Sequence, residues 1–212
     1  ILFAPVHLHS YNYWNSLIIS MESANTALTH APSLARCNQA TRISFTALYD
    51  AYFSRVYNYV RYRCTDADTA DDLTAIIFEK ALLHFHRYQP DRAPFGAWLF
   101  SIARNIVNEH LRGIRNHKSS SIEVLVNQPT LDELPETNLI SAETARELLM
   151  ALNTLDERER DLISLKFAAR LTNRRIAEIS GLSETNVGVI LYRSLKKLRA
   201  QLETRDTYHG SS

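Results

Sequence analysis

Apolar residues recur three and four residues apart over most of the chain, and polar stretches separate these periodic segments. This spacing places the apolar side chains on one face of a helix and differs from the alternation that a strand requires. The predicted helices cover residues 44–63, 69–88, 95–112, 141–152, 154–167, 173–180 and 184–199. The sequence contains only five Gly and six Pro in 212 residues. The pattern therefore predicts an all-α protein.

Changes in composition divide the chain into two small helical domains joined by a flexible linker. The first domain is predicted over residues 43–115 and the second over residues 141–204. Residues 116–140 lie between them and contain two prolines and a run of three serines. The stretch 119–147 is acidic, with six acids and one Arg. Such a segment is typical of a linker. A polar tail, residues 205–212, is expected to fray.

The N-terminal segment, residues 1–42, shows no helical period and is expected to be a disordered arm. The chain begins with Ile1, and its first methionine is Met21. Residues 1–20 are apolar and aromatic, but no basic segment precedes them, so they are a poor signal peptide. We therefore expect translation to start at Met21, with the preceding residues an over-extended gene start. The sequence has no run of about 18 apolar residues, which argues against membrane insertion.

Helix starts are marked by short polar patterns. Thr69 with Asp72, and Thr154 with Glu157, have the spacing of capping boxes, in which two side chains bond the first backbone amides of a helix. Both pairs stand directly before periodic apolar residues. The pairs therefore predict the starts of two helices.

The stretch from residue 172 to residue 199 has the spacing of a helix-turn-helix. Residues 173–180 form the first helix, Gly181 leaves it at positive φ, and Ser183 caps the second helix. The residues expected to be buried between these helices and their neighbours are Ile176, Ile179, Val187, Ile190, Leu191, Leu195 and Leu198. The second helix of such a unit enters the major groove of DNA.

The distribution of charge supports a nucleic-acid partner. Residues 166–199 contain eight Lys or Arg and two Glu, whereas the net charge of the whole chain is only +1. Residues 87–118 are also basic, with six Lys or Arg and two acids. Phosphate binding requires such clusters. A helical hairpin with a solvated basic face is the alternative, but it does not explain a glycine followed by a cap.

No pattern in the sequence indicates catalysis or a bound metal. Cys37 and Cys64 have no C-x-x-C spacing, which fits a reducing cytoplasm. The histidine pairs within residues 7–9 and 84–86 lack a third ligand or point to different helix faces. Phosphate-binding glycine loops and the common hydrolase and protease motifs are missing. The sequence therefore argues against an enzyme and predicts neither a metal nor a cofactor.

Over residues 45–112 and 147–202 the chain resembles the extracytoplasmic-function (ECF) type of bacterial RNA polymerase sigma factor. The residues that resemble the family's polymerase-binding helix are Asp71, Asp72, Leu73, Phe78 and Ala81. Those that resemble its minus-10 helix are Phe95, Trp98, Leu99, Phe100, Ile102, Ala103, Arg104, Asn105, Leu111 and Arg112. Those that resemble its minus-35 domain are Leu152, Leu155, Glu159, Arg160, Leu162, Leu165, Lys166, Phe167, Ile176, Ala177 and Glu178. The linker is too short for the middle domain of primary sigma factors.

The resemblance implies that the first domain captures an unstacked base of the minus-10 strand. Asn105 matches the base-reading position, and Tyr88 approximates an aromatic residue of the preceding loop. Arginines on the same helix would hold phosphates. The minus-10 candidates are Tyr88, Trp98, Arg104, Asn105, Asn108, Arg112 and Arg115.

The resemblance also implies the remaining contacts. The minus-35 candidates are Gly188, Val189, Tyr192 and Arg193 for the groove, and Arg174, Arg175, Lys196 and Lys197 for the backbone. The candidates for core-polymerase binding are Asp71, Asp72, Leu73, Ala75, Ile76 and Glu79. The implied partners are the clamp coiled coil and flap of core RNA polymerase, promoter DNA, and an anti-sigma factor. The chemistry would belong to the polymerase.

Two departures from the family pattern leave alternatives open. Ala75 and Ile76 stand where the clamp helix usually carries Gln and Glu, and Gly188 and Ile190 stand where the recognition helix is usually basic. A helix-turn-helix regulator that does not act through core polymerase is one rival interpretation. A helical interaction module, or a sigma-like decoy that no longer binds polymerase, is the other.

Overall fold

The computed structural model describes the backbone of residues 32–64, 66–120 and 139–209. Its side chains are described for residues 45–64, 66–116 and 144–203. The chain divides into two compact units, Ile1–Ala51 and Tyr52–Ser212. All contacts described below lie within the second unit.

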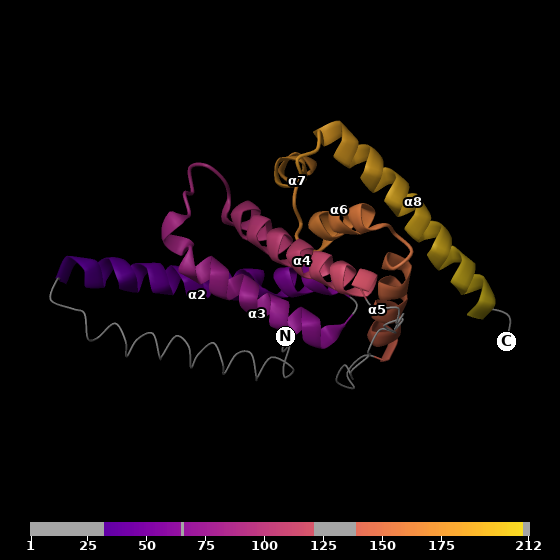
Figure 1. Ribbon diagram of the computed structural model, residues 1–212, viewed down its shortest axis with the longest axis horizontal. Helices are drawn as coiled ribbons and strands as arrows, with labels where there is room; N and C mark the ends of the chain where they lie inside the picture. Colours follow the sequence, from indigo (N-terminus) through magenta and orange to yellow (C-terminus); the bar gives the residue numbers. More distant parts are fainter. Residues whose placement is uncertain (1–31, 65, 121–138, 210–212) are drawn as a thin grey trace. The chain divides into compact units, whose positions relative to one another are not determined.

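Every element in the described part of the chain is a helix (Figure 1). They are α2 (Pro32–Arg63), α3 (Ala67–Leu83), the short 3₁₀ helix η1 (Phe85–Arg87), α4 (Phe95–Ser120), α5 (Leu139–Leu152), α6 (Glu157–Phe167), α7 (Asn173–Ser180) and α8 (Glu184–His209). The prediction of an all-α fold is confirmed for these residues.

The N-terminal module, residues 52–116, has a core built by one face of each of its three long helices. Helices α3 and α4 pack along one another (Figure 1). Tyr59 of α2 meets Phe100 of α4 edge to face, with ring centroids 5.7 Å apart, and both side chains are fully buried. Other fully buried side chains are Val56, Val60, Ile77, Phe78, Leu99 and Val107. This core fixes the face that α4 presents outward.

The C-terminal module, residues 144–203, packs α6 and α7 against α8. Along α8 the buried stripe consists of Val187, Leu191, Ser194 and Leu198, which follow one another by four, three and four residues. The prediction placed Leu195 in this stripe, and that was wrong, because Leu195 is 44% exposed. Ser194 takes the inward position and donates its hydroxyl to the carbonyl of Ile190, which satisfies the buried oxygen. Ile190 itself is half-buried.

Both predicted capping boxes were misplaced, because aspartates nearby cap the helices instead. Asp66 accepts a hydrogen bond from the Thr69 backbone amide at 2.7 Å and starts α3. Asp156 forms a complete capping box with Glu159 at the start of α6. Thr154 donates its hydroxyl to a backbone carbonyl in the preceding turn. Asp ranks above Thr at the N-cap position, which accounts for the shift.

Several helices are longer than their apolar patterns predicted. Helix α2 begins at Pro32, so residues 32–42, assigned to a disordered arm, are helical. Proline suits the first position of a helix, and the Ala, Arg and Gln that follow favour the conformation. Helix α4 continues to Ser120 and α8 to His209, into the predicted linker and tail. The rest of the arm, residues 1–31, and of the linker, residues 121–138, lie outside the described residues.

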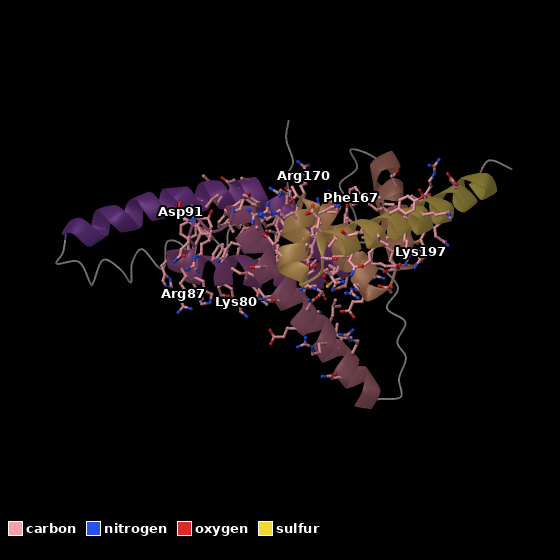
Figure 2. All side chains as sticks on the ribbon, turned by 90° about the horizontal axis from the view of Figure 1, so that it is seen from above. Lys80, Arg87, Asp91, Phe167, Arg170 and Lys197 are labelled. Carbon is pink, nitrogen blue, oxygen red and sulfur yellow. The ribbon has the colours of Figure 1, made fainter. Side chains whose placement is uncertain are left out.

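The end of α6 carries an unusual backbone conformation. Arg170, which is labelled in Figure 2 and follows the last residue of α6 by three positions, has a φ of 52° and is the one described non-glycine residue with positive φ. The Leu171 amide bonds back to the Leu165 carbonyl at 3.1 Å. This closing bond turns the chain sharply before α7 begins.

Candidate nucleic-acid interface

The helix-turn-helix has the local geometry that the sequence predicted. Thr172 caps α7 by accepting from the Arg175 amide. Gly181 ends α7 in the left-handed conformation, with φ 73° and ψ 19°, which L-residues adopt at a cost. Ser183 then accepts from the Asn186 amide at 3.2 Å and starts α8. In Figure 1, α7 and α8 meet at this turn.

The start of α8 presents an exposed face. Tyr192 is 72% exposed and Val189 is 41% exposed, although both are large and apolar or aromatic. Arg193 and Lys196 are also exposed, whereas Gly188 is half-buried. Val189 and Tyr192 stand three residues apart, so they share one side of α8, and apolar side chains that gather on an exposed face can mark an interaction surface.

Other basic residues predicted to touch the DNA backbone are already paired with acids. Arg174 and Arg175 both contact Glu178, and the hydrogen bond from Arg175 is the main cause that lowers the pKa of the Glu178 carboxyl. Lys197, on α8 (Figure 2), lies 2.5 Å from Glu159. These pairs are exposed on at least one side, so they are weak and can exchange for phosphate.

An aromatic cluster lies at the start of α4. Tyr88 and Trp98, both minus-10 candidates, have ring centroids 5.3 Å apart. Phe85 and Phe95 complete the cluster, at 6.1 Å and 5.4 Å from Tyr88. The Tyr88 hydroxyl donates to the Ala93 carbonyl at 3.2 Å, which ties the loop before α4 to itself. Phe95 is buried, whereas Phe85, Tyr88 and Trp98 are half-buried and leave part of their rings accessible for a base to stack on.

Asn105 lies on the exposed side of α4, in an open cleft next to this cluster. The cleft is lined by Ala93, Ala97, Trp98, Ser101, Asn105, Glu178 and Ile179. Its first five lining residues belong to α4 and the loop before it, and the last two belong to α7. No local pattern had indicated that α7 would form one wall of this cleft.

The polar residues further along α4 differ in their surroundings. Arg104 donates through Nε to Asp161 of α6 at 2.7 Å and through Nη1 to the Ile179 carbonyl at 3.2 Å. Arg115 is paired with Glu157 of α6. Asn108 accepts from Arg63 at 2.9 Å. Arg112 is exposed.

Sequence reasoning missed a buried polar cluster formed by Tyr59, Arg63 and Asp161. Arg63 is 3% exposed and Asp161 is 4% exposed. The Tyr59 hydroxyl donates to Asp161 at 3.0 Å, and the Arg63 Nε lies 3.7 Å from the same carboxylate. Burial and then the charge of Asp161 raise the pKa of Tyr59 well above its ordinary value, so the hydroxyl remains a donor. Charged residues on helices are usually exposed, so no pattern in the neighbouring sequence indicated that Arg63 and Asp161 would be buried.

Helix α3 presents an exposed face of mixed character. Asp72, Ile76, Glu79 and Leu83 are exposed and follow one another by four, three and four residues, so they share one side of the helix. Ile76 is 39% exposed and Leu83 is 55% exposed. Of the other predicted polymerase contacts, Asp71 and Ala75 are half-buried, whereas Leu73 is only 5% exposed and belongs to the core.

Within the described residues, no three His, Cys, Asp or Glu side chains gather in a way that could hold a metal ion. The same residues include no helix that is long and apolar enough to cross a membrane.

Two family models match the chain. The model described as Sigma-70 region 2 matches residues 48–117, and the model described as Sigma-70, region 4 matches residues 145–198. Together they cover more than half of the chain. The region 2 segment contains the exposed residues of α3 and α4, and the region 4 segment contains the exposed face at the start of α8.

Curated proteins of similar sequence agree with this match. The chain is 30% identical over 167 residues to the RNA polymerase sigma factor YlaC of Bacillus subtilis, covering 76% of this chain and 93% of YlaC. It is 29% identical over 155 residues to the ECF RNA polymerase sigma factor BldN of Streptomyces coelicolor, covering 73% of this chain. The match spans 59% of BldN. For the ECF sigma factor SigM of B. subtilis, identity is 26% and the match spans 91% of the relative.

Two solved structures share the fold. The sigma factor RpoE of Bartonella quintana, in complex with the anti-sigma factor NepR, gives a TM-score of 0.66 at 20% identity, over 76% of this chain and 97% of that one. CnrH, in complex with the cytosolic domain of CnrY, gives 0.58 at 21% identity, over 79% and 94%.

Proposed function

Because the chain belongs to the ECF family of sigma-70 factors, which direct RNA polymerase to promoters and start transcription, we propose that its two modules divide promoter recognition between them. The C-terminal module reads the minus-35 element as duplex. The N-terminal module melts the minus-10 element and holds it as a single strand. The observation that carries this proposal is the exposed face of α8 directly after the left-handed turn at Gly181.

The minus-35 contact is made by the first turns of α8 in the major groove. Tyr192 and Val189 supply apolar and aromatic surface, and Arg193 supplies hydrogen-bond donors for base edges. Gly188 adds no side chain, which lets the backbone come close to the DNA. Lys196 binds a phosphate directly, and Lys197 and the arginines of α7 do so after exchanging their carboxylate partners.

The minus-10 contact is made by α4 and the loop before it. An unstacked base enters beside Tyr88 and Trp98, and the Asn105 amide bonds its edge. Arg104, Arg112 and Arg115 bind the strand's phosphates. The cost of unstacking one base is a few kcal/mol, and stacking of about 1–3 kcal/mol per base on aromatic side chains offsets it.

The polymerase contact is made by the exposed face of α3. Ile76 and Leu83 give the apolar centre of this face, and Asp72 and Glu79 give it negative charge at its edge. Apolar area at this position replaces the polar pair that the family usually carries. Leu73 does not contact the polymerase in this proposal, because it is buried and packs α3 against the core of the module.

An anti-sigma factor is a further proposed partner. Both structures of similar fold contain a partner protein, which is the anti-sigma factor NepR for RpoE and the cytosolic domain of CnrY for CnrH. The proposal places the chain in the cytoplasm, where polymerase and chromosome are. The flap of the polymerase is the proposed contact for the C-terminal module.

The assignment of one promoter element to each module is tested with a randomised promoter library. The library is transcribed by core RNA polymerase with the full chain, and the templates that yield transcripts are sequenced. Tyr192→Ala is expected to change base preferences in the upstream element only. Asn105→Ala is expected to change them in the downstream element only. Asn58→Ala, at an exposed asparagine of α2 outside both faces, is the matched control and leaves both elements unchanged. Variants that alter the same element, or neither, would refute the assignment.

A further inference from the structure

The two modules are joined by polar contacts, and most of these converge on α6. From the N-terminal module, Arg104 and Tyr59 donate to the carboxylate of Asp161 at 2.7 Å and 3.0 Å. Arg63 donates to the Glu157 carbonyl at 2.7 Å, and Arg115 pairs with the Glu157 carboxylate. Two acids on one helix therefore engage four side chains of the other module.

These contacts occupy the groups that a DNA strand needs. Arg104 and Arg115 are two of the three arginines proposed to hold minus-10 phosphates, and each is bound to a carboxylate of α6. The Arg104–Asp161 pair is largely buried, whereas the Arg115–Glu157 pair is exposed and adds only a weak contact. Asp161 and Glu157 stand four residues apart, so they lie one above the other on the same face of the helix. They present two successive negative charges to a row of arginines, as the phosphates of a strand would.

The contacts between the modules also place α7 beside the cleft next to the aromatic cluster. Glu178 and Ile179 of α7 form one wall of the cleft that contains Asn105. The Ile179 carbonyl is bonded to Arg104, which holds this wall in place. By contrast, the α3 face around Ile76 and the α8 face around Tyr192 stay exposed.

Building on the proposed function, we propose that α6 acts as an intramolecular mimic of the minus-10 strand, with Asp161 as the group that holds the module pair closed. In the closed state the chain can still present α3 to polymerase and α8 to duplex DNA. It cannot bind the minus-10 strand until α6 has left α4. The strand and α6 therefore compete for the same arginines.

Asp161 is the group on which closure depends, because it is the most deeply buried of the acids in these contacts. A charge buried beside two arginines is stable only when it is paired, and removing it leaves Arg63 buried with less compensation. Separation of the two modules removes this cost of an unpaired buried charge, because Arg63 and Arg104 are then solvated. Neutralising Asp161 therefore favours opening.

The test compares the full chain with Asp161→Asn and with Glu203→Gln. Glu203 forms an exposed pair with Arg199 within α8, so its variant removes the same charge from the surface of that helix. Small-angle X-ray scattering on the free chains measures closure without any assumption about function. The radius of gyration is expected to rise for Asp161→Asn alone. Equal radii for all three chains would overturn the proposal.

The second measurement is the binding of a fluorescent single-stranded DNA of random sequence, followed by anisotropy without polymerase. Asp161→Asn is expected to bind about tenfold more tightly than the wild type, the gain for a chain that is closed about nine-tenths of the time. Glu203→Gln is expected to match the wild type. A variant that expands without binding the strand more tightly than this control would also overturn the proposal, because α6 would then not cover the site.

Two further results keep the inference separate from the proposed function. Tyr59→Phe keeps the ring in the core and removes one hydrogen bond to Asp161, so it should give a smaller change in the same direction. No change in either measurement would contradict the role of Asp161 in holding the two modules closed. A wild-type chain that directs no transcripts in the library assay would remove the proposed function, while the scattering result would still decide whether the modules close.

Discussion

Gly181 and Gly113 allow one chemical change to be tested in two backbone conformations. A Cβ at either position would meet no atom within 4 Å, so packing contributes nothing to the comparison. Gly181 has a φ of 73°, whereas Gly113 lies inside α4 and is not among the residues of positive φ. Any difference between the two alanine variants therefore reports on the backbone.

Gly181→Ala is expected to lower the free energy of unfolding by about 1 kcal/mol. Alanine in the left-handed region costs about 1–2 kcal/mol, and its less flexible unfolded chain offsets about 0.4–1 kcal/mol of this. Gly113→Ala is expected to raise it by about 1 kcal/mol, because alanine is the better residue inside a helix. For a chain of this size each change corresponds to about 2–4 °C in Tm.

The assay is thermal and urea unfolding of the full chain, followed by helical circular dichroism. Gly181→Asn provides a graded comparison and should lose less than the alanine variant, because asparagine tolerates the left-handed conformation better. A stabilising Gly181→Ala, of the same sign as Gly113→Ala, would refute the claim that the turn depends on a left-handed residue.

Three other predictions concern single side chains. Asp66→Ala should lower the free energy of unfolding by about 1 kcal/mol near neutral pH. The cap hydrogen bonds lower the pKa of Asp66, so this loss of stability should shrink as the pH falls below about 3.9. An equal loss at low pH in urea titrations would contradict this. Burial raises the pKa of Cys64 to about 11, so in a Cys37→Ser background it should react with an aromatic disulfide reagent only after unfolding, and rapid reaction of the native chain would disprove its burial. Ile77→Ala, at a fully buried position, should cost about 2–5 kcal/mol of unfolding free energy. Ile76→Ala, at a position that is 39% exposed, should cost clearly less and should weaken core-polymerase binding in pull-down titrations. The reverse pattern would show that the exposed face of α3 has been misassigned.

The helix-turn-helix could be predicted from the sequence because its signals are local. A glycine that must adopt positive φ and a serine that caps the next helix fix the turn within a few residues. The bounds of α7 were predicted correctly for this reason. The start of α3 was missed because the prediction chose Thr69 although Asp66, three residues earlier, is the stronger cap.

Burial along α8 was predicted less well, since a helix can rotate slightly without losing its apolar pattern. Leu195 and Ser194 are neighbours, and packing against α6 and α7 decided which one faces inward. The polar cluster around Asp161 could not be predicted at all. Its partners lie 57 and 102 residues away in the sequence, and no local pattern distinguishes a buried aspartate from a solvated one.

The central claim, that this chain gives core polymerase its promoters, is tested most directly by run-off transcription. Purified core RNA polymerase is supplied with a library of genomic fragments from the source organism, with and without the full chain. Discrete start sites that appear only with the chain, and that Asn105→Ala removes, are the predicted result. The absence of new start sites, with duplex DNA binding retained, would contradict the claim and favour a helix-turn-helix regulator that does not act through polymerase.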